Sequence, residues 1–255
     1  MHFDILTLFP EMFAGPLTAS ILGKAQQSGL VSVDVWNIRD YALDKHKIVD
    51  DTPYGGGAGM ILKTDVLVRA IESVRGDDSK TPVIYLSPQG KVFDQQMAAR
   101  LADLPRVILL SGHYEEIDER VRAHWVDDEL SIGDYVLTGG ELPAMVVVDA
   151  VTRLLPGVLG DENSHQQDSF QNGLLDHPHY TRPASFRGLP VPTVLMSGHH
   201  GNIARYRLKE ALRRTMQRRP DLLEKKDLSM EERQLLEELA TEYSVEGRVN
   251  TNESD

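Results

Sequence analysis

Residues 106–125, RVILLSGHYEEIDERVRAHW, decide the fold class of this chain. The first seven residues are rich in branched aliphatic side chains and end in Ser-Gly, which is typical of a buried strand. EEIDERVRAHW, at 115–125, instead has the spacing of an amphipathic helix. A strand, a loop and a helix in that order predict a parallel sheet covered by helices.

The same alternation extends through the first 160 residues. Further strands are predicted at FDILTLF (3–9), VSVDVWNI (31–38), PVIYLSP (82–88) and ELSIGDYVL (129–137). Further helices are predicted at 64–75, 93–104 and 143–155, the first with Leu67, Ala70, Ile71 and Val74 on one face and Thr64 or Asp65 as its cap. This part of the chain is predicted to be an α/β domain.

The pattern changes after residue 157. Residues 157–195 are rich in Gly, Pro, Asn and His without clear periodicity, which indicates a linker and loop. Helices are predicted at 202–219, 220–226 and 229–244, the last with Ser229 and Glu232 as a capping box. The final five residues are expected to fray.

Composition excludes several classes of protein. The chain has no cysteine, so disulfides, thiolate zinc sites and Cys nucleophiles are excluded. Its apolar runs fall far short of the roughly 20 residues of a membrane span, and its start lacks the basic flank of a secretory signal. We therefore expect a cytoplasmic protein with no membrane partner.

Charge is unevenly distributed along the chain. The net charge is −12, yet residues 205–226 hold nine Lys/Arg against three acids, whereas residues 227–255 hold two against nine. A basic helix is as often a solvated face as a binding face. A local basic stripe can nevertheless bind RNA, because phosphate contacts are short-ranged at physiological salt.

Three predicted strands run into unusual loops that begin with Leu-Ser. These are LSPQG (86–90), LSGHYEEIDER (110–120) and LSIGDYVLTGGELP (130–143). Ligands of open α/β sheets bind beyond the carboxyl ends of the strands, so the three loops are predicted to converge on a ligand. The alternative is three ordinary tight turns.

Two other motifs are less informative. PYGGGAGM, at 53–60, completes neither the dinucleotide nor the P-loop fingerprint, and a flexible turn explains it equally well. Histidines occur in HPH (177–179) and HH (199–200). Without cysteine, a zinc site would need carboxylate and His ligands from separate loops, so no metal ligand is assigned.

Taken together, LFPEMF, VDDTPYGGGAGM, YLSPQG, GHYEEIDER, SIGDYVLTGGELPAM, LPGVLG, DSF and LLDHPHYTRP resemble the bacterial tRNA (guanine-N1)-methyltransferases. The motifs occur in order from about residue 1 to 245. The resemblance implies a SPOUT-type parallel sheet with a deep trefoil knot and a small helical C-terminal domain. General topology rules would not have predicted a knot.

The resemblance also implies an activity, which is methylation at N1 of the guanine immediately 3′ of the anticodon (nucleotide 37) with S-adenosylmethionine as methyl donor. It implies a knotted catalytic domain at 1–160, a flexible linker at 161–176 and a tRNA-binding domain at 177–255. The cofactor-binding residues that it implies are Tyr85, Leu86, Ser87, Pro88, Gly112, Ile132, Gly133, Asp134, Tyr135, Val136, Leu137, Gly139, Gly140 and Glu141.

Guanine N1 carries a proton, and its removal places negative charge on O6, so the reaction calls for a base and a cation. By motif match, Asp168 resembles the family's base and Arg153 the arginine that stabilises O6. Taken alone, Asp168 would be a turn-capping loop residue and Arg153 a surface residue at a helix end. The resemblance also implies a need for Mg²⁺, whose ligands stay unassigned, although Glu115 is a candidate participant.

The resemblance further implies a homodimer whose two subunits share the active site, and it implies tRNA as the partner. Asp50 and the glycines 55, 56, 57 and 59 are then expected on the substrate side. The resemblance assigns the basic helix to tRNA phosphates. The residues expected to contact tRNA are Asp50, Gly55, Gly56, Gly57, Gly59, Glu115, His200, Asn202, Arg205, Arg213 and Arg214.

One departure is Glu116, which stands where the family usually has glycine. We hypothesise a rearranged cofactor pocket with retained activity. The alternatives are a sister SPOUT methyltransferase with another RNA target, or an RNA-binding module that has lost catalysis.

Overall fold

The computed structural model describes residues 1–160 and 168–251, and the side chains up to residue 243. The chain divides into two compact units, Met1–Glu162 and Asn163–Asp255. Most of the C-terminal tail and the first part of the expected linker, residues 161–167, lie outside the described residues.

The first unit contains a five-stranded sheet in the order β2-β1-β6-β5-β8, and every neighbouring pair is parallel. Its strands are β1 (His2–Thr7), β2 (Ser32–Asn37), β5 (Val83–Val92), β6 (Arg106–Ser111) and β8 (Asp128–Ser131). β6 is central, and its Leu109 pairs with Ile5 on one side and Ile84 on the other. The prediction of a parallel α/β sheet is confirmed.

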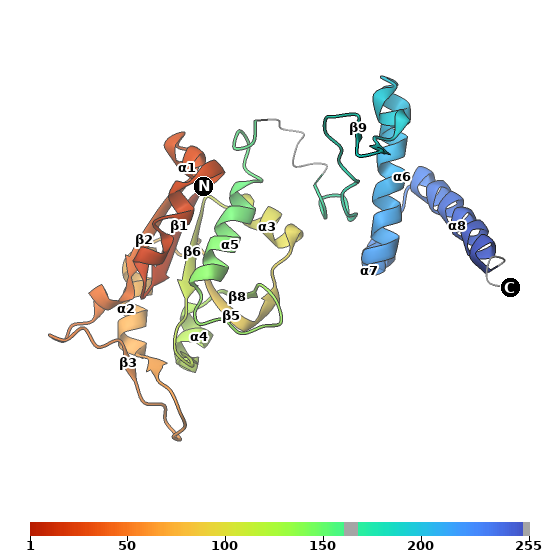
Figure 1. Ribbon diagram of the computed structural model, residues 1–255. Coiled ribbons are helices and arrows are strands. Elements are labelled where there is room, and N and C mark those ends of the chain that lie inside the picture. The colour runs from red at the N-terminus through yellow and green to blue at the C-terminus, as the bar shows by residue number, and fades with distance from the viewer. Residues whose placement is uncertain (161–167, 252–255) are drawn as a thin grey trace. The chain divides into compact units, whose positions relative to one another are not determined.

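Helices cover both faces of this sheet (Figure 1). One core packs the sheet against α1 (Ser20–Gln27), α3 (Gln95–Ala102) and α5 (Glu141–Thr152), and the other packs it against α2 (Thr64–Arg75) and α4 (Glu119–Trp125). Alternate residues of β6 serve the two cores, as strand geometry requires, with Val107 in the first and Ile108 in the second.

A second, smaller sheet changes the boundaries of the helix predicted at 115–125. It contains β3 (Asp50–Asp51), β4 (Ile61–Leu62) and β7 (Glu116–Ile117), in the order β3-β4-β7. The predicted helix at 115–125 is therefore wrong over its first four residues, because β7 pairs with β4 and helix α4 starts only after it.

Two other predictions are wrong in detail. The strand predicted at 129–137 stops at Ser131, because Gly133 takes φ 147° and the Tyr135 N–H bonds to the Gly133 carbonyl in a turn. Neither Thr64 nor Asp65 caps α2, since Lys63 holds the N-cap position without a side-chain cap.

The second unit is mainly helical. It contains a hairpin of β9 (Ser185–Phe186) and β10 (Leu189–Pro190), followed by α6 (His200–Arg218), α7 (Pro220–Lys225) and α8 (Met230–Thr251). α6 and α8 pack around the buried leucines 174, 212, 235 and 239. The predicted capping box is confirmed: Glu232 accepts from the Ser229 N–H at 2.8 Å, and Ser229 Oγ accepts from the Glu232 N–H at 3.2 Å.

Candidate functional site

A pocket of about 110 Å³ lies beyond the ends of β6 and β8 and beside residues 85–88 of β5. The three loops that begin with Leu-Ser converge there, as predicted. Of the fourteen expected cofactor residues, twelve line the pocket, namely Tyr85, Leu86, Ser87, Pro88, Gly112, Ile132, Gly133, Tyr135, Val136, Leu137, Gly139 and Gly140. Asp134 and Glu141 do not line it; Glu141 is buried and accepts a hydrogen bond from Thr7 Oγ1 at 2.7 Å.

Local backbone features bring the loops together. β5 continues through Ser-Pro-Gln-Gly, but its register against β8 shifts between Leu86 and Lys91, so the backbone between them bulges. Gly140, at the N-terminus of α5, donates its N–H to the Gly112 carbonyl at 2.9 Å, and Gly139 forms a β-bridge with His113. The start of α5 is thereby attached to the end of β6.

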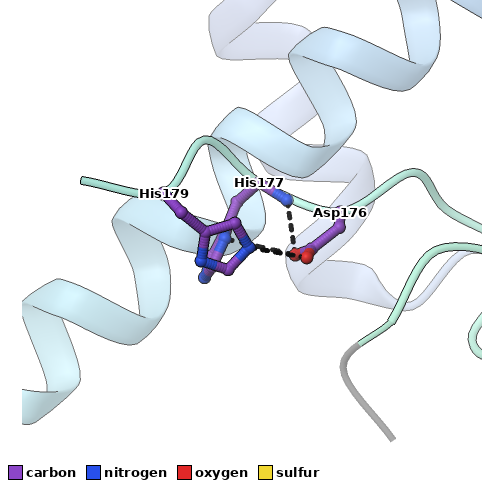
Figure 2. A group of neighbouring side chains, drawn as sticks. All are labelled: Asp176, His177 and His179. Carbon is purple, nitrogen blue, oxygen red and sulfur yellow. Dashed lines mark hydrogen bonds and ion pairs between the residues drawn. The ribbon is translucent and has the colours of Figure 1, made fainter. Parts of the chain in front are cut away.

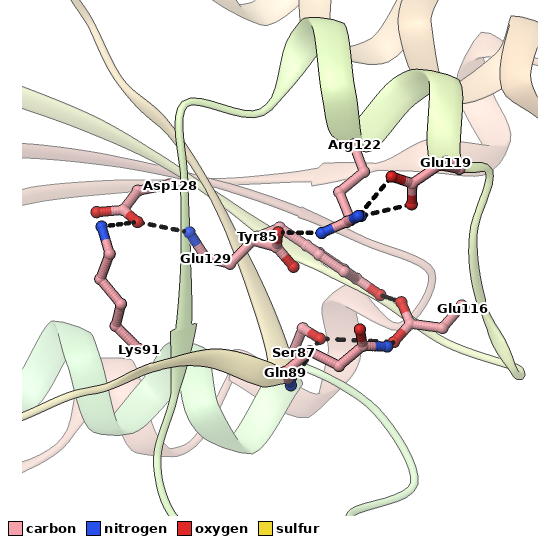
Figure 3. A network of polar contacts seen from close by, with 9 residues as sticks. All are labelled: Tyr85, Ser87, Gln89, Lys91, Glu116, Glu119, Arg122, Asp128 and Glu129. Atoms are coloured by element: carbon pink, nitrogen blue, oxygen red, sulfur yellow. Dashed lines mark hydrogen bonds and ion pairs between the residues drawn. The ribbon is translucent and has the colours of Figure 1, made fainter.

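Glu116 closes one side of this pocket through a polar network (Figure 3). Its carboxylate accepts from Tyr85 Oη at 2.8 Å, from Gln89 Nε2 at 3.0 Å and from Ser87 Oγ at 3.5 Å. Burial and the nearby Glu116 charge raise the pKa of Tyr85 well above its usual value. Tyr85 therefore stays protonated and keeps donating to Glu116.

The pocket wall has features that suit a polar ligand. His113 Nδ1 is buried without a hydrogen-bond partner among the described residues, which marks an unsatisfied polar atom at the wall. At Gly112 a Cβ atom would lie 2.6 Å from Tyr85 Oη, so only glycine leaves this backbone open. Four further pocket-lining residues were not among the cofactor residues expected from the sequence, namely His113, Tyr114, Thr138 and Pro143.

The glycine-rich segment connects β3 to β4 beside the pocket. Gly55, Gly56 and Gly57 all have positive φ, and a Cβ atom would meet nothing within 4 Å at any of them. Gly59, also at positive φ, lies against the Glu115 side chain, and the Glu115 N–H bonds to the Met60 carbonyl at 3.1 Å. Asp50 accepts from Tyr114 Oη at 3.4 Å, so the hairpin adjoins a pocket-lining residue.

The two residues expected to be catalytic lie in different units. Arg153 is exposed at the C-terminal cap of α5 and donates its N–H to the Asp149 carbonyl. Asp168 is half-buried in the second unit, and its carbonyl accepts from the Gln171 N–H at 3.3 Å.

The basic face of α6 is paired with acids of α8. Arg205 pairs with Glu238, Lys209 with Glu238 and Glu242, and Arg213 with Glu242 at 2.9 Å. The Lys209 and Arg213 side chains beside Glu242 lower the pKa of that carboxyl, so these charges persist. Arg214 instead donates to the Asp176 carbonyl, and His200 is exposed at the start of α6.

Over the described residues, no helix is both long and apolar enough to cross a membrane.

Comparison with known proteins supplies the family. A family model described as tRNA (Guanine-1)-methyltransferase TrmD matches residues 1–225. A tRNA (guanine-N(1)-)-methyltransferase of Dehalococcoides mccartyi (strain CBDB1) is 56% identical over 97% of this chain and 100% of its own length. The enzyme of the same name from Brevibacillus brevis is 58% identical over 95% of this chain and 99% of its own length. That from Chloroflexus aggregans is 60% identical over 88% of this chain and 88% of its own length. The chain therefore belongs to the TrmD family of tRNA (guanine-1)-methyltransferases.

Proposed function

We propose that this tRNA (guanine-N1)-methyltransferase acts on the guanine immediately 3′ of the anticodon, nucleotide 37, and so supports reading-frame maintenance. The observation that carries the proposal is the 56% identity over the full length of a relative named tRNA (guanine-N(1)-)-methyltransferase; the position of the target guanine is proposed from the family resemblance. The geometry adds a pocket at the strand ends, where α/β sheets bind ligands.

That pocket is proposed to hold S-adenosylmethionine. When bound, S-adenosylmethionine would supply an electrophilic methyl group carried on its sulfonium. The residues present fit it: the glycines at 112, 139 and 140 line the pocket and let its loops pack closely together, and the buried His113 Nδ1 offers a polar partner. At about 110 Å³ the pocket is smaller than the roughly 300 Å³ at which ligand sites begin, so its walls must move on binding.

Asp168 and Arg153 are proposed to do the proton chemistry. The Asp168 carboxylate would take the proton from guanine N1, which frees the N1 lone pair to accept the methyl group that bound S-adenosylmethionine would supply, with the thioether as the leaving group. The Arg153 guanidinium donates hydrogen bonds to O6, where negative charge develops. Positioning of the purine against the methyl supplies much of the remaining rate.

The assembly is proposed from the family resemblance. It includes the deep trefoil knot, the domains at 1–160 and 177–255 with a linker between them, and a homodimer whose subunits share the active site. Leu142 and Val146 support a dimer: they are 49% and 44% exposed on α5 and lie one helical turn apart. Mg²⁺ is proposed as a requirement, with Glu115 beside the glycine hairpin as a candidate participant.

Substrate tRNA is proposed to contact the glycine hairpin with Asp50, and on α6 His200, Arg205, Arg213 and Arg214. The ion pairs with α8 mean that Arg205 and Arg213 must exchange carboxylates for phosphates when tRNA binds. The acids of α8 therefore compete with the RNA.

We expect Glu242→Gln to tighten tRNA binding about two- to fivefold, because it removes one of the carboxylates that compete with phosphate for Lys209 and Arg213, which keep Glu238 and Glu210 as partners. The stability lost should be at most about 1 kcal/mol, as for other exposed ion pairs. Filter binding at several salt concentrations measures the affinity and its salt slope. Glu237→Gln, an exposed acid on the same helix, is the matched control; unchanged affinity in Glu242→Gln would show that these cations do not meet RNA.

We expect the wild-type chain to bind S-adenosylmethionine with Glu116 in place. Glu116→Gly should shift the dissociation constant by on the order of fivefold, since one net hydrogen bond contributes about 1 kcal/mol. Isothermal calorimetry measures this, with Gln89→Ala as a control that removes another member of the network. Binding undetectable in wild type and restored by Glu116→Gly would contradict the expectation that the pocket stays functional with Glu116 in place.

The function is tested with labelled S-adenosylmethionine and paired tRNA transcripts that carry G or A after the anticodon. Label on the G transcript alone is the expected result. Label on both would indicate another RNA target, and label on neither would indicate a binding module without catalysis.

A further inference from the structure

The loop Asp176-His177-Pro178-His179 places one carboxylate and two imidazoles together (Figure 2). Asp176 Oδ2 lies 2.7 Å from His179 Nε2, and Asp176 Oδ1 lies 3.2 Å from His177 Nδ1. One ligand atom from each of the three lies within 4.8 Å of the others. Tetrahedral bonds of about 2.0–2.1 Å to one ion require donors roughly 3.3 Å apart, and the Asp176 oxygens lie 2.7 Å and 3.2 Å from the two imidazole nitrogens.

The loop is fixed to the helical unit from both sides. Leu174 is buried in its core, and the next N–H, of Leu175, bonds to Thr215 Oγ1 at 2.9 Å. Asp176 donates its N–H to Ser169 Oγ and accepts at its carbonyl from Arg214. These contacts hold the loop in place. Asp176 Oδ1 also accepts the His177 N–H at 2.7 Å, while Oδ2 faces His179.

His177 provides an independent indication of a ligand. Its side chain is 9% exposed, and its buried Nδ1 makes no hydrogen bond among the described residues, although Asp176 Oδ1 lies 3.2 Å away. The ring packs edge-on against His179, with centroids 4.4 Å apart, so both imidazoles face the same small space. A buried polar atom without a partner calls for an explanation, and a bound cation beside Asp176 gives one.

We propose that Asp176, His177 and His179 form a transition-metal site, with Zn²⁺ as the ion that the donors fit best. Two imidazole nitrogens and one carboxylate oxygen suit Zn²⁺, whereas Mg²⁺ prefers oxygen ligands and octahedral geometry. Both histidines line a pocket of about 540 Å³, from which a fourth ligand can reach the ion. Arg182 and Arg207 line the same pocket, and their charge favours an anionic or water oxygen as the fourth ligand.

A similar group, formed by His2, Asp4 and Asp34, does not carry this inference. Asp4 is already satisfied by Arg106 Nε at 2.8 Å and Trp36 Nε1 at 2.7 Å. An arginine bound to the central carboxylate excludes a cation there. No cation contacts the Asp176 carboxylate in this way among the contacts of the described residues.

The test is a Zn²⁺ titration of the full chain after treatment with a chelator, followed by calorimetry. We expect one Zn²⁺ per chain, retained in excess Mg²⁺, and Co²⁺ absorption typical of a tetrahedral site. His179→Ala should weaken Zn²⁺ binding on the order of tenfold or more, and this side chain is 69% exposed, so the variant should fold. His177→Gln should weaken it as well, with folding checked by circular dichroism.

His199→Ala is the matched control, because His199 is exposed in the same unit but lies outside the cluster. The control should bind Zn²⁺ as the wild type does. No binding by the wild type, displacement by Mg²⁺, or equal affinity in His179→Ala and wild type would overturn the proposal.

Discussion

Asp168→Asn should slow methyl transfer by roughly 10²–10⁴-fold and leave the affinity for S-adenosylmethionine nearly unchanged. The amide is almost isosteric with the carboxylate but cannot take the proton from guanine N1. Asp168 belongs to the second unit, whereas the pocket beside β5 and beyond the ends of β6 and β8 is built wholly within the first. The proposed base and the proposed cofactor pocket should therefore be separable by mutation.

Single-turnover transfer to the G transcript measures the first quantity, and calorimetry with S-adenosylmethionine measures the second. Asp227→Asn is the control, since Asp227 is an exposed aspartate of the same unit. Raising the pH should not restore the rate of methyl transfer in Asp168→Asn. The exception would be a reaction in which hydroxide takes the N1 proton in place of the carboxylate. A variant that keeps wild-type turnover, or that loses cofactor binding, would show that Asp168 is not the base.

The fold was predicted best where the determinants are local. The apolar stripe of Leu67, Ala70, Ile71 and Val74 predicts α2 over 64–75, which is where the structure has it. Errors occur where distant residues decide the conformation. Glu116 and Ile117 have helical spacing, yet they pair with Ile61 and Leu62, more than fifty residues earlier in the chain.

The site shows the same division. The strand-end rule predicts that three loops meet, because parallel strands share one carboxyl edge. It does not predict which side chains point inward: of the cofactor residues that the resemblance implies, Asp134 and Glu141 do not line the pocket, and His113, which does, was not among them. His113 is positioned by its bridge to Gly139, a contact between two loops that neither loop encodes alone.

The charge pattern of the C-terminal unit indicates that its two long helices pair with each other. A basic run at 205–226 precedes an acidic run at 227–255, and oppositely charged neighbouring helices are well suited to pair. The structure shows this pairing between α6 and α8. A basic helix followed by an acidic one thus predicts an intramolecular partner as readily as a nucleic acid.

Gly140→Ala should both destabilise the first unit and impair the proposed cofactor pocket. A Cβ atom on Gly140 would lie 2.7 Å from Ser111 Cα and 2.9 Å from Gly112 N. These are backbone atoms at the end of β6, so no side-chain rotation relieves the clash. We expect the free energy of unfolding to fall by about 1–3 kcal/mol, the usual cost of overpacking.

The same displacement should weaken S-adenosylmethionine binding by roughly 5- to 150-fold, which is the range that corresponds to 1–3 kcal/mol when that cost falls on the bound state. The start of α5 can relieve the clash only by moving away from β6, which strains the hydrogen bond from Gly140 N–H to the Gly112 carbonyl. Both residues line the pocket. Urea unfolding and calorimetry on one protein preparation measure the two effects.

Two glycine variants separate a backbone clash from a general effect of adding a methyl. Gly15→Ala should be neutral in both measurements, because a Cβ there meets nothing within 4 Å. Gly139→Ala should be intermediate, because its Cβ first meets the side chains of Glu141 and His113, which can rotate. If Gly140→Ala lost stability but bound S-adenosylmethionine normally, the junction of α5 and β6 would hold the fold together without shaping the pocket. The cofactor would then have to be placed away from the strand ends.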